Sequence, residues 1–192
     1  MDEWKWWDEL DGEDLTKNAW GFPYYDVNAV ADFIVENIGN MGDRCLDIGC
    51  GPGRLGHELA RRFPDTEFHG VDVSAKMLGM SMENAPPNWT SEVNDGMSVP
   101  NGVRYTAAYS VTVFQHLPHE VVCRYIQQTY ERLRTNGRII FTYAIGNEEA
   151  PRSYQASHEL AVSWLEDAGF WDILQPTTPE THPDWHWLVA VK

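Results

Sequence analysis

The chain has 192 residues, enough for one domain with a substantial core and too few for a dinucleotide-binding half with a separate substrate domain. Its formal net charge of −15 disfavours duplex nucleic acid as a partner, because the phosphates would be repelled. The three cysteines form no Cys-x-x-Cys pair, no apolar run could span a bilayer, and the N-terminus is acidic. These features predict a reduced, cytoplasmic protein without a membrane span.

Helices alternate with strands along residues 26–192. The hydrophobic pattern predicts helices over 26–40 (with Asp26 as a candidate N-cap), 54–63, 74 to just before Pro86, 118–134 and 153–168. It predicts strands over 44–49, 67–73, 89–94, 103–110, 138–145, 170–175 and 186–191. The connection 96–102 is too short for more than a turn of helix. The alternation indicates an α/β fold with a mostly parallel sheet and right-handed crossovers, and the last two strands should form a hairpin.

A glycine-rich segment from Leu46 to Gly56 is the most informative part of the chain. A buried strand ends in Asp47, breaks into glycines and restarts as a helix. Glycines let the backbone approach a ligand closely, and a helix N-terminus offers free N–H groups, so this segment predicts a site for a nucleotide-like ligand. Taken literally, the Gly-x-Gly-x-x-Gly spacing followed by Asp72 also fits NAD, which leaves an NAD-linked oxidoreductase as an alternative.

The run Asp47-Ile48-Gly49-Cys50-Gly51-Pro52-Gly53 resembles the first motif of class I S-adenosylmethionine (SAM)-dependent methyltransferases. An acid at the strand end can attract the cationic methionine part of SAM, whereas a pyrophosphate site would avoid it. Further segments resemble that family in order, so the resemblance covers about residues 26–192: 68–74, 94–97, 108–117, 133–141 and 164–170.

The resemblance implies a single-domain Rossmann-like fold. Its seven-stranded, mostly parallel sheet would have the order 3-2-1-4-5-7-6, with helices on both faces and a C-terminal antiparallel hairpin. Ligands would then bind beyond the carboxyl ends of strands one and four. The chain departs from the family in two places. It lacks the helix that usually fits between strands three and four, and it keeps only Gly137 for a left-handed helix end where the family often has Lys-Pro-Gly-Gly.

By the same resemblance, the cofactor is SAM and the product is S-adenosylhomocysteine (SAH). The carboxylate of Asp72 would accept both ribose hydroxyls, Asp95 would accept from the adenine amino group, and Met97 would lie against the ring. Tyr24 and Tyr25 either close over SAM or pack against the first helix. The residues expected to contact the cofactor are Asp47, Gly49, Cys50, Gly51, Gly53, Arg54, Asp72, Val73, Met77, Asn94, Asp95, Gly96, Met97, Ser110, Val111 and Tyr25.

Methyl transfer from a sulfonium mostly requires alignment, and a base is needed only if the acceptor holds a proton of high pKa. His116 is the candidate base, with His119 as a weaker one; the alternative is that His116 caps the sheet edge. The breadth of the family implies an O or N atom as acceptor, and we expect a small molecule because the chain has neither the large substrate domain nor the basic surface expected for a macromolecular substrate. Residues 110–117 also lack the Asn/Asp-Pro-Pro-Tyr/Phe run of many nucleic-acid base methyltransferases, which disfavours amino-group methylation of adenine or cytosine in DNA. A non-catalytic SAM-binding scaffold protein is the alternative from another class.

The sequence predicts two parts, an aromatic and acidic segment over 1–25 and a methyltransferase domain over 26–192. The first is either a lid over the active site or a mobile arm, and its residues Trp4, Trp6 and Trp7 would also suit a helix face packed on the body. No metal site is expected, because Pro183 prevents His182 and His186 from sharing a helix face. A monomer or a homodimer is expected.

Overall fold

The computed structural model of the chain describes residues 7, 9, 26–145, 154–177 and 186–192. The helices are α3 (Val27–Ile38), α4 (Arg54–Arg62), α5 (Ala75–Met82), the short 3₁₀ helix η1 (Phe114–His116), α6 (His119–Arg132) and α7 (His158–Ala168). The strands are β1 (Arg44–Ile48), β2 (Glu67–Asp72), β3 (Trp89–Val93), β4 (Tyr105–Ser110), β5 (Leu133–Ile145), β6 (Gln155–Ala156), β7 (Trp171–Leu174) and β8 (His186–Val191).

One sheet runs through the molecule in the order β3-β2-β1-β4-β5-β8-β7. Strands β1 to β5 pair in parallel, and β8 lies antiparallel to both β5 and β7. Since β7 and β8 are the sixth and seventh strands of the sequence prediction, the expected order and the C-terminal hairpin are confirmed. The two-residue β6 is an addition that pairs with the end of β5.

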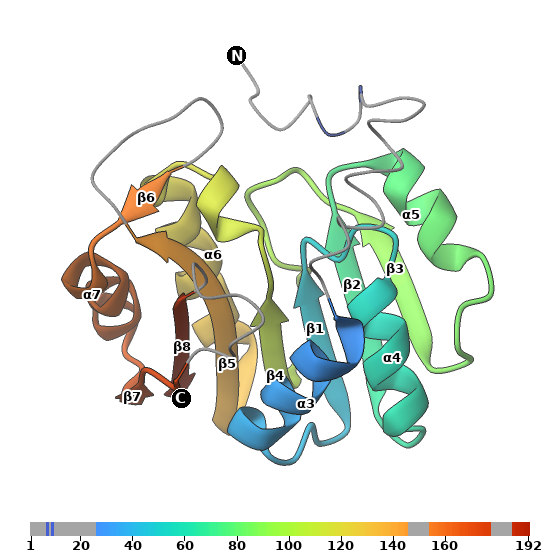
Figure 1. The fold of residues 1–192 in the computed structure, drawn as a ribbon, viewed down its shortest axis with the longest axis horizontal. Helices are drawn as coiled ribbons and strands as arrows, with labels where there is room; N and C mark the ends of the chain where they lie inside the picture. The colour runs from blue at the N-terminus through green and yellow to red at the C-terminus, as the bar shows by residue number, and fades with distance from the viewer. Residues whose placement is uncertain (1–6, 8, 10–25, 146–153, 178–185) are drawn as a thin grey trace.

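The helices cover both faces of the sheet, as expected. Figure 1 shows α3 and α4 in front of the sheet and α6 behind it. The first helix forms where its residues dictate: the Asp26 carboxylate accepts from the N–H groups of Asn28 and Ala29 at 2.9 and 3.2 Å. Val30, Ile34 and Ile38 then bury one stripe of α3 against the sheet. Two buried clusters result, one under α3, α4 and α5 and the other under α6 and α7.

Two element boundaries differ from the sequence prediction by five residues. Strand β5 begins at Leu133 rather than at 138, because Leu133 pairs with Tyr105 and the N–H of Asn136 donates to the Lys192 carbonyl at 2.9 Å. The left-handed residue at this corner is Asn136, with a φ of 62°, and not the Gly137 that we expected. Helix α7 begins at His158, five residues later than predicted, since β6 occupies the preceding residues.

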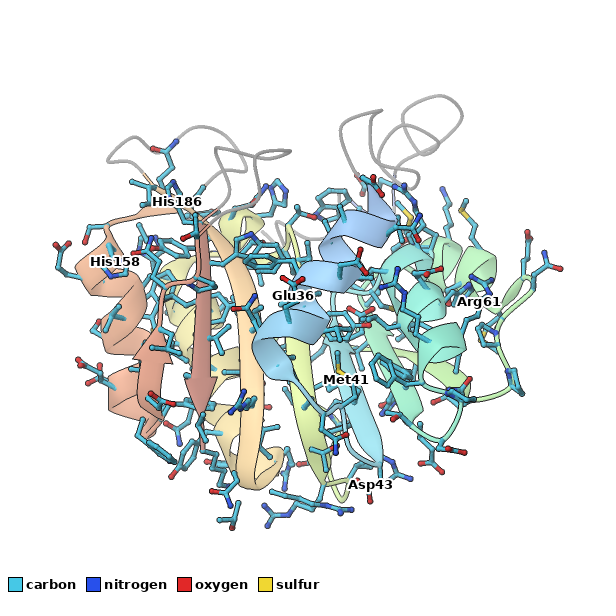
Figure 2. The ribbon with its side chains drawn as sticks, turned by 60° about the horizontal axis from the view of Figure 1, so that its bottom comes forward. Glu36, Met41, Asp43, Arg61, His158 and His186 are labelled. Atoms are coloured by element: carbon cyan, nitrogen blue, oxygen red, sulfur yellow. The ribbon has the colours of Figure 1, made fainter. Side chains whose placement is uncertain are left out.

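The parallel strands place several chain segments at one edge of the sheet. The carboxyl ends of β1, β2 and β4 meet there, whereas Asp43, which precedes β1, lies at the opposite end (Figure 2). The residues that follow these three strands are therefore neighbours, although up to about sixty positions separate them in the sequence.

Candidate functional site

A cavity of about 200 Å³ borders the carboxyl ends of β1, β2 and β4. Of the residues expected to contact the cofactor or the acceptor, those that line it are Asp47, Gly49, Cys50, Gly51, Arg54, Asp72, Val73, Met77, Gly96, Val111 and His116. The lining residues that the sequence argument did not assign to the site are Trp7, Ile48, Pro52, Leu55, Thr112, Val113, Leu117 and Tyr125. The cavity therefore gathers residues from most of the segments that the motifs marked.

Two glycines of the loop have a positive φ, and they differ in the space around them. Gly49 has a φ of 74°, and a Cβ there would lie 2.3 Å from a methyl group of Val113. Gly51 has a φ of 52°, and a Cβ there would meet no atom within 4 Å. Gly51 borders the cavity, so its missing side chain leaves space into which a ligand can fit.

Asp72 fixes the loop and faces the cavity. One carboxylate oxygen accepts from the N–H of Gly51 at 2.8 Å and the other accepts from the N–H of Ser74 at 2.9 Å. Asp72 lines the cavity, and an ionised carboxylate at that position can accept hydrogen bonds from hydroxyl groups of a ligand. This geometry suits the predicted binding of a ribose diol.

Asp47 is a buried carboxyl group in the cavity wall. It is 4% exposed and accepts a hydrogen bond of 2.9 Å from the Tyr109 hydroxyl. Burial raises the pKa of Asp47 to about 8; the Tyr109 bond opposes that shift, and the charge of Asp72 adds to it. A cationic ligand group beside Asp47 would favour its ionised form.

Cys50 lies in the glycine loop but has poor nucleophilic character. Burial raises the pKa of its thiol well above the ordinary value, and the charges of Asp47 and Asp72 raise it further. Its role in the structure is that of a small buried side chain next to Gly70.

The segment after β3 contributes through its backbone and through one amide. Gly96 borders the cavity. Asn94 contacts Gly96 from outside the cavity lining. The Nδ2 of Asn94 donates to the Tyr125 hydroxyl at 2.9 Å, and the Oδ1 of Asn94 accepts from the N–H of Gly96 at 3.1 Å. This Asn94–Tyr125 pair links β3 to α6.

Besides Asn94, four residues expected at the cofactor lie outside the cavity lining. Asp95 accepts from the N–H of Met97 at 2.9 Å and from the Ser98 hydroxyl at 2.6 Å. Partial burial raises the pKa of Asp95, but these hydrogen bonds outweigh it and the net shift is downward. Met97 contacts the core next to α6, Gly53 precedes α4, and Ser110 donates to the Ile48 carbonyl at 3.0 Å.

The exit of β4 forms the other wall. Thr112 adopts a φ of 60°, a costly conformation for a β-branched residue, and its N–H donates to the Thr142 hydroxyl at 2.7 Å. Beyond it, the His116 ring meets the Trp7 ring edge-on, with the centroids 5.4 Å apart. Both rings line the cavity.

The two candidate histidines differ in their surroundings. His119 does not line the cavity; its Nε2 lies 3.1 Å from the Gln155 carbonyl, and its ring contacts Trp164. In His116, Nε2 lies 3.4 Å from the amide nitrogen of Gln115. His116 lines the cavity, so of the two histidines it is the one placed to meet a ligand.

Several residues with a role predicted from the sequence lie outside the described residues: Trp4, Trp6, Tyr24, Tyr25 and His182. His186 is described and lies at the start of β8; Figure 2 labels it together with His158. The His186 ring contacts Tyr143, whose hydroxyl forms a hydrogen bond with Nδ1 of His158. Within the described part of the chain, no group of three or more metal-binding side chains is arranged to hold an ion, and no helix is long and apolar enough to cross a membrane.

The comparisons with known proteins agree in kind. A family model described as a methyltransferase domain matches residues 45–137. A trans-aconitate 2-methyltransferase of Rhodopseudomonas palustris (strain BisB18) is 34% identical over 94 residues, which are 49% of this chain and 36% of that protein. A ubiquinone biosynthesis O-methyltransferase of Alkalilimnicola ehrlichii is 28% identical over 160 residues, 78% of this chain and 58% of that one. The chain thus spans less than two thirds of either relative.

A similar fold is found in a solved structure of magnesium protoporphyrin IX methyltransferase from Synechocystis PCC 6803 with bound SAH. It matches with a TM-score of 0.71 and 22% identity, over 100% of this chain and 93% of that one. At this identity the likeness concerns the fold.

Proposed function

Because the chain belongs to the class I S-adenosylmethionine-dependent methyltransferase family, we propose that it binds SAM in the cavity and transfers its methyl group to a small-molecule acceptor. The observation that carries this proposal is the position of Gly51. Its absent side chain opens onto the cavity between Asp47 and Asp72, so the loop can lie against a ligand that both acids contact.

The residues fit the charges of SAM, which has cationic and anionic groups at one end and a ribose diol nearer the other. Asp72 would hold the ribose hydroxyls, and Asp47 would face the cationic methionine part. Arg54, which begins α4 and lines the cavity, would meet the carboxylate. When bound, SAM supplies an activated methyl group with a neutral thioether as leaving group. The chain's own task is then to align the acceptor and exclude water.

We assign His116 as the residue that accepts a proton from an O or N acceptor. It lines the cavity, and a neutral imidazole has one ring nitrogen that can accept a proton. Trp7 lies against His116, so we also propose that the segment 1–25 closes the acceptor side of the site and that 26–192 is the methyltransferase domain. General-base catalysis contributes typically about 10²–10⁴-fold to rate.

Calorimetric titration with SAM, SAH and, separately, NADH tests the cofactor. We expect SAM and SAH to bind and NADH not to bind. The variant Gly51→Val should lose binding of both SAM and SAH, because the valine side chain would occupy the space of the ligand. Gly102→Val is the matched control: Gly102 also has a positive φ, of 78°, and open space at its Cβ position, but it lies outside the cavity lining. NADH binding without SAM binding would overturn the proposal and support an oxidoreductase.

Methyl transfer is tested with labelled SAM and a panel of hydroxyl and amine acceptors. His116→Gln should slow transfer by about 10²-fold or more without changing the dissociation constant of SAH. His119→Gln should retain the rate, since His119 lies outside the cavity lining. SAM binding without transfer to any acceptor would favour the scaffold alternative.

A further inference from the structure

Helix α6, which the glycine motifs do not mark, contributes one residue to the lining of the cavity. Residues 94–104, which connect β3 to β4, contain no helix. They lie instead on α6, where Gln128 accepts from the N–H of Val99 at 2.8 Å and donates to the Met97 carbonyl at 3.2 Å. With this connection reduced to a loop, α6 reaches the cavity through Tyr125.

The Tyr125 side chain is held in one orientation. It is 3% exposed, and its ring stacks on Phe114 with the centroids 6.2 Å apart. Asn94 donates to its hydroxyl oxygen at 2.9 Å. The Asn94 amide is itself oriented, because its oxygen accepts from the N–H of Gly96. The Tyr125 oxygen therefore acts as an acceptor toward the protein.

The hydroxyl proton of Tyr125 is left to donate elsewhere. Among the described residues, the structure gives this hydroxyl no partner besides Asn94, and its side chain borders the cavity. Burial, and to a smaller extent the charges of Asp95 and Asp72, raise the pKa of the phenol despite the Asn94 bond, so the group stays protonated. A buried donor beside a cavity predicts an acceptor atom on the ligand.

We propose that Tyr125 is a cofactor-specificity residue whose hydroxyl donates a hydrogen bond to a ring nitrogen of the adenine of SAM. This inference rests on the proposed function, with the ribose held at Asp72. The adenine then lies toward the segment after β3, where Gly96 and Tyr125 border the cavity. Adenine presents acceptors at N1, N3 and N7, and a phenol donor discriminates against a base that lacks the contacted nitrogen.

The experiment combines one protein change with single-atom changes in the ligand. The variant Tyr125→Phe removes the hydroxyl and keeps the ring on Phe114, while Asn94 retains the Ser98 carbonyl as a partner. Tyr130→Phe is the control, since Tyr130 lies on the same helix outside the cavity lining. The dissociation constants of SAH and of its 1-deaza, 3-deaza and 7-deaza analogues are measured by calorimetry for all three proteins.

We expect Tyr125→Phe to bind SAH about 2- to 13-fold more weakly than wild type, the range of one neutral hydrogen bond. Wild type should lose a similar factor with one deaza analogue, and Tyr125→Phe should lose nothing further with that analogue. A role in packing alone would weaken all four ligands equally and would not produce this coupling.

Three outcomes overturn the inference. They are unchanged SAH binding by Tyr125→Phe, equal weakening for every analogue, and a wild-type protein that binds all three deaza analogues as tightly as SAH. The measurement on wild type with the deaza analogues needs no variant, so it tests the inference even if Tyr125→Phe fails to fold. A folded wild type that does not bind SAH at all would refute the proposed function itself.

Discussion

The substitution Asp47→Asn should change how the stability of the protein depends on pH. Asp47 is buried, and its pKa is raised to about 8 from an ordinary value of 3.8. Below pH 3.8 the folded and unfolded states both hold its proton. Between these two values the unfolded chain releases the proton while the folded protein retains it, so the free energy of unfolding falls as the pH rises.

The size of the effect follows from that window. One pKa unit corresponds to about 1.4 kcal/mol, so two pH units inside the window cost about 2–3 kcal/mol of folding stability. The amide that replaces the carboxyl group carries no titrating proton, and its oxygen can still accept from Tyr109, which lies 2.9 Å from the Asp47 oxygen. The variant should therefore gain about 2–3 kcal/mol relative to wild type between about pH 5 and pH 7.

Urea denaturation at about pH 5, 6 and 7 in the absence of ligand measures this difference. Glu36→Gln is the control, since Glu36 is an exposed acid on α3 (Figure 2). If wild type and Asp47→Asn gave parallel profiles over this range, Asp47 would not be held neutral by burial and the reasoning would fail.

Three further substitutions test particular contacts. Asp72→Ala should weaken SAH binding by about 1.5–3 kcal/mol, because charge-assisted hydrogen bonds to the ligand and to the glycine loop are lost. Calorimetry measures this loss, and an unchanged affinity would exclude Asp72 from the site. Thr112→Gly should raise the free energy of unfolding by about 1 kcal/mol, since glycine adopts the φ of 60° without strain; a loss in urea melts would show that the threonine contacts outweigh it. Asn88→Ala should lower the free energy of unfolding by about 1–3 kcal/mol, because the Asn88 amide donates to three backbone carbonyls at 2.7–3.0 Å; an unchanged urea midpoint would contradict this.

The sheet order was predictable because it depends on a coarse signal. Strands and helices alternate up to α6 and β5, apart from the β3–β4 connection. Right-handed crossovers then restrict the topology, and the absence of a helix between the last two strands predicts the hairpin. What the periodicity missed was set by long-range pairing. Leu133 extends β5 because it pairs with Tyr105, and β6 forms because Gln155 lies beside Ala144. Neither partner is close in sequence.

The site was predictable where a local motif carries it and unpredictable where tertiary packing does. Asp47, Gly51 and Asp72 belong to strand ends that the pattern marks, and all three line the cavity. Tyr125 lies in mid-helix, where its residue type indicates a core position. The one sequence signal that pointed to it is the short connection 96–102, which leaves no room for a helix between β3 and β4. Another helix must then pack over that end of the sheet.

Two features of the described structure cost folding free energy, and both border the same cavity. The carboxyl group of Asp47 is buried, which costs desolvation free energy. Thr112 is a β-branched residue with a φ of 60°, which costs backbone strain. The Tyr109 hydroxyl donates a hydrogen bond to Asp47, and the Thr142 hydroxyl accepts one from the N–H of Thr112. A cationic ligand group would convert the first cost into an attraction, since it favours the ionised carboxylate that burial alone opposes. The left-handed residue Thr112 precedes Val113, which lies against Gly49 of the glycine loop. The strained backbone at Thr112 therefore sets the course of the cavity wall that faces that loop. Costs of this kind are expected where a chain is shaped for a ligand rather than for stability alone.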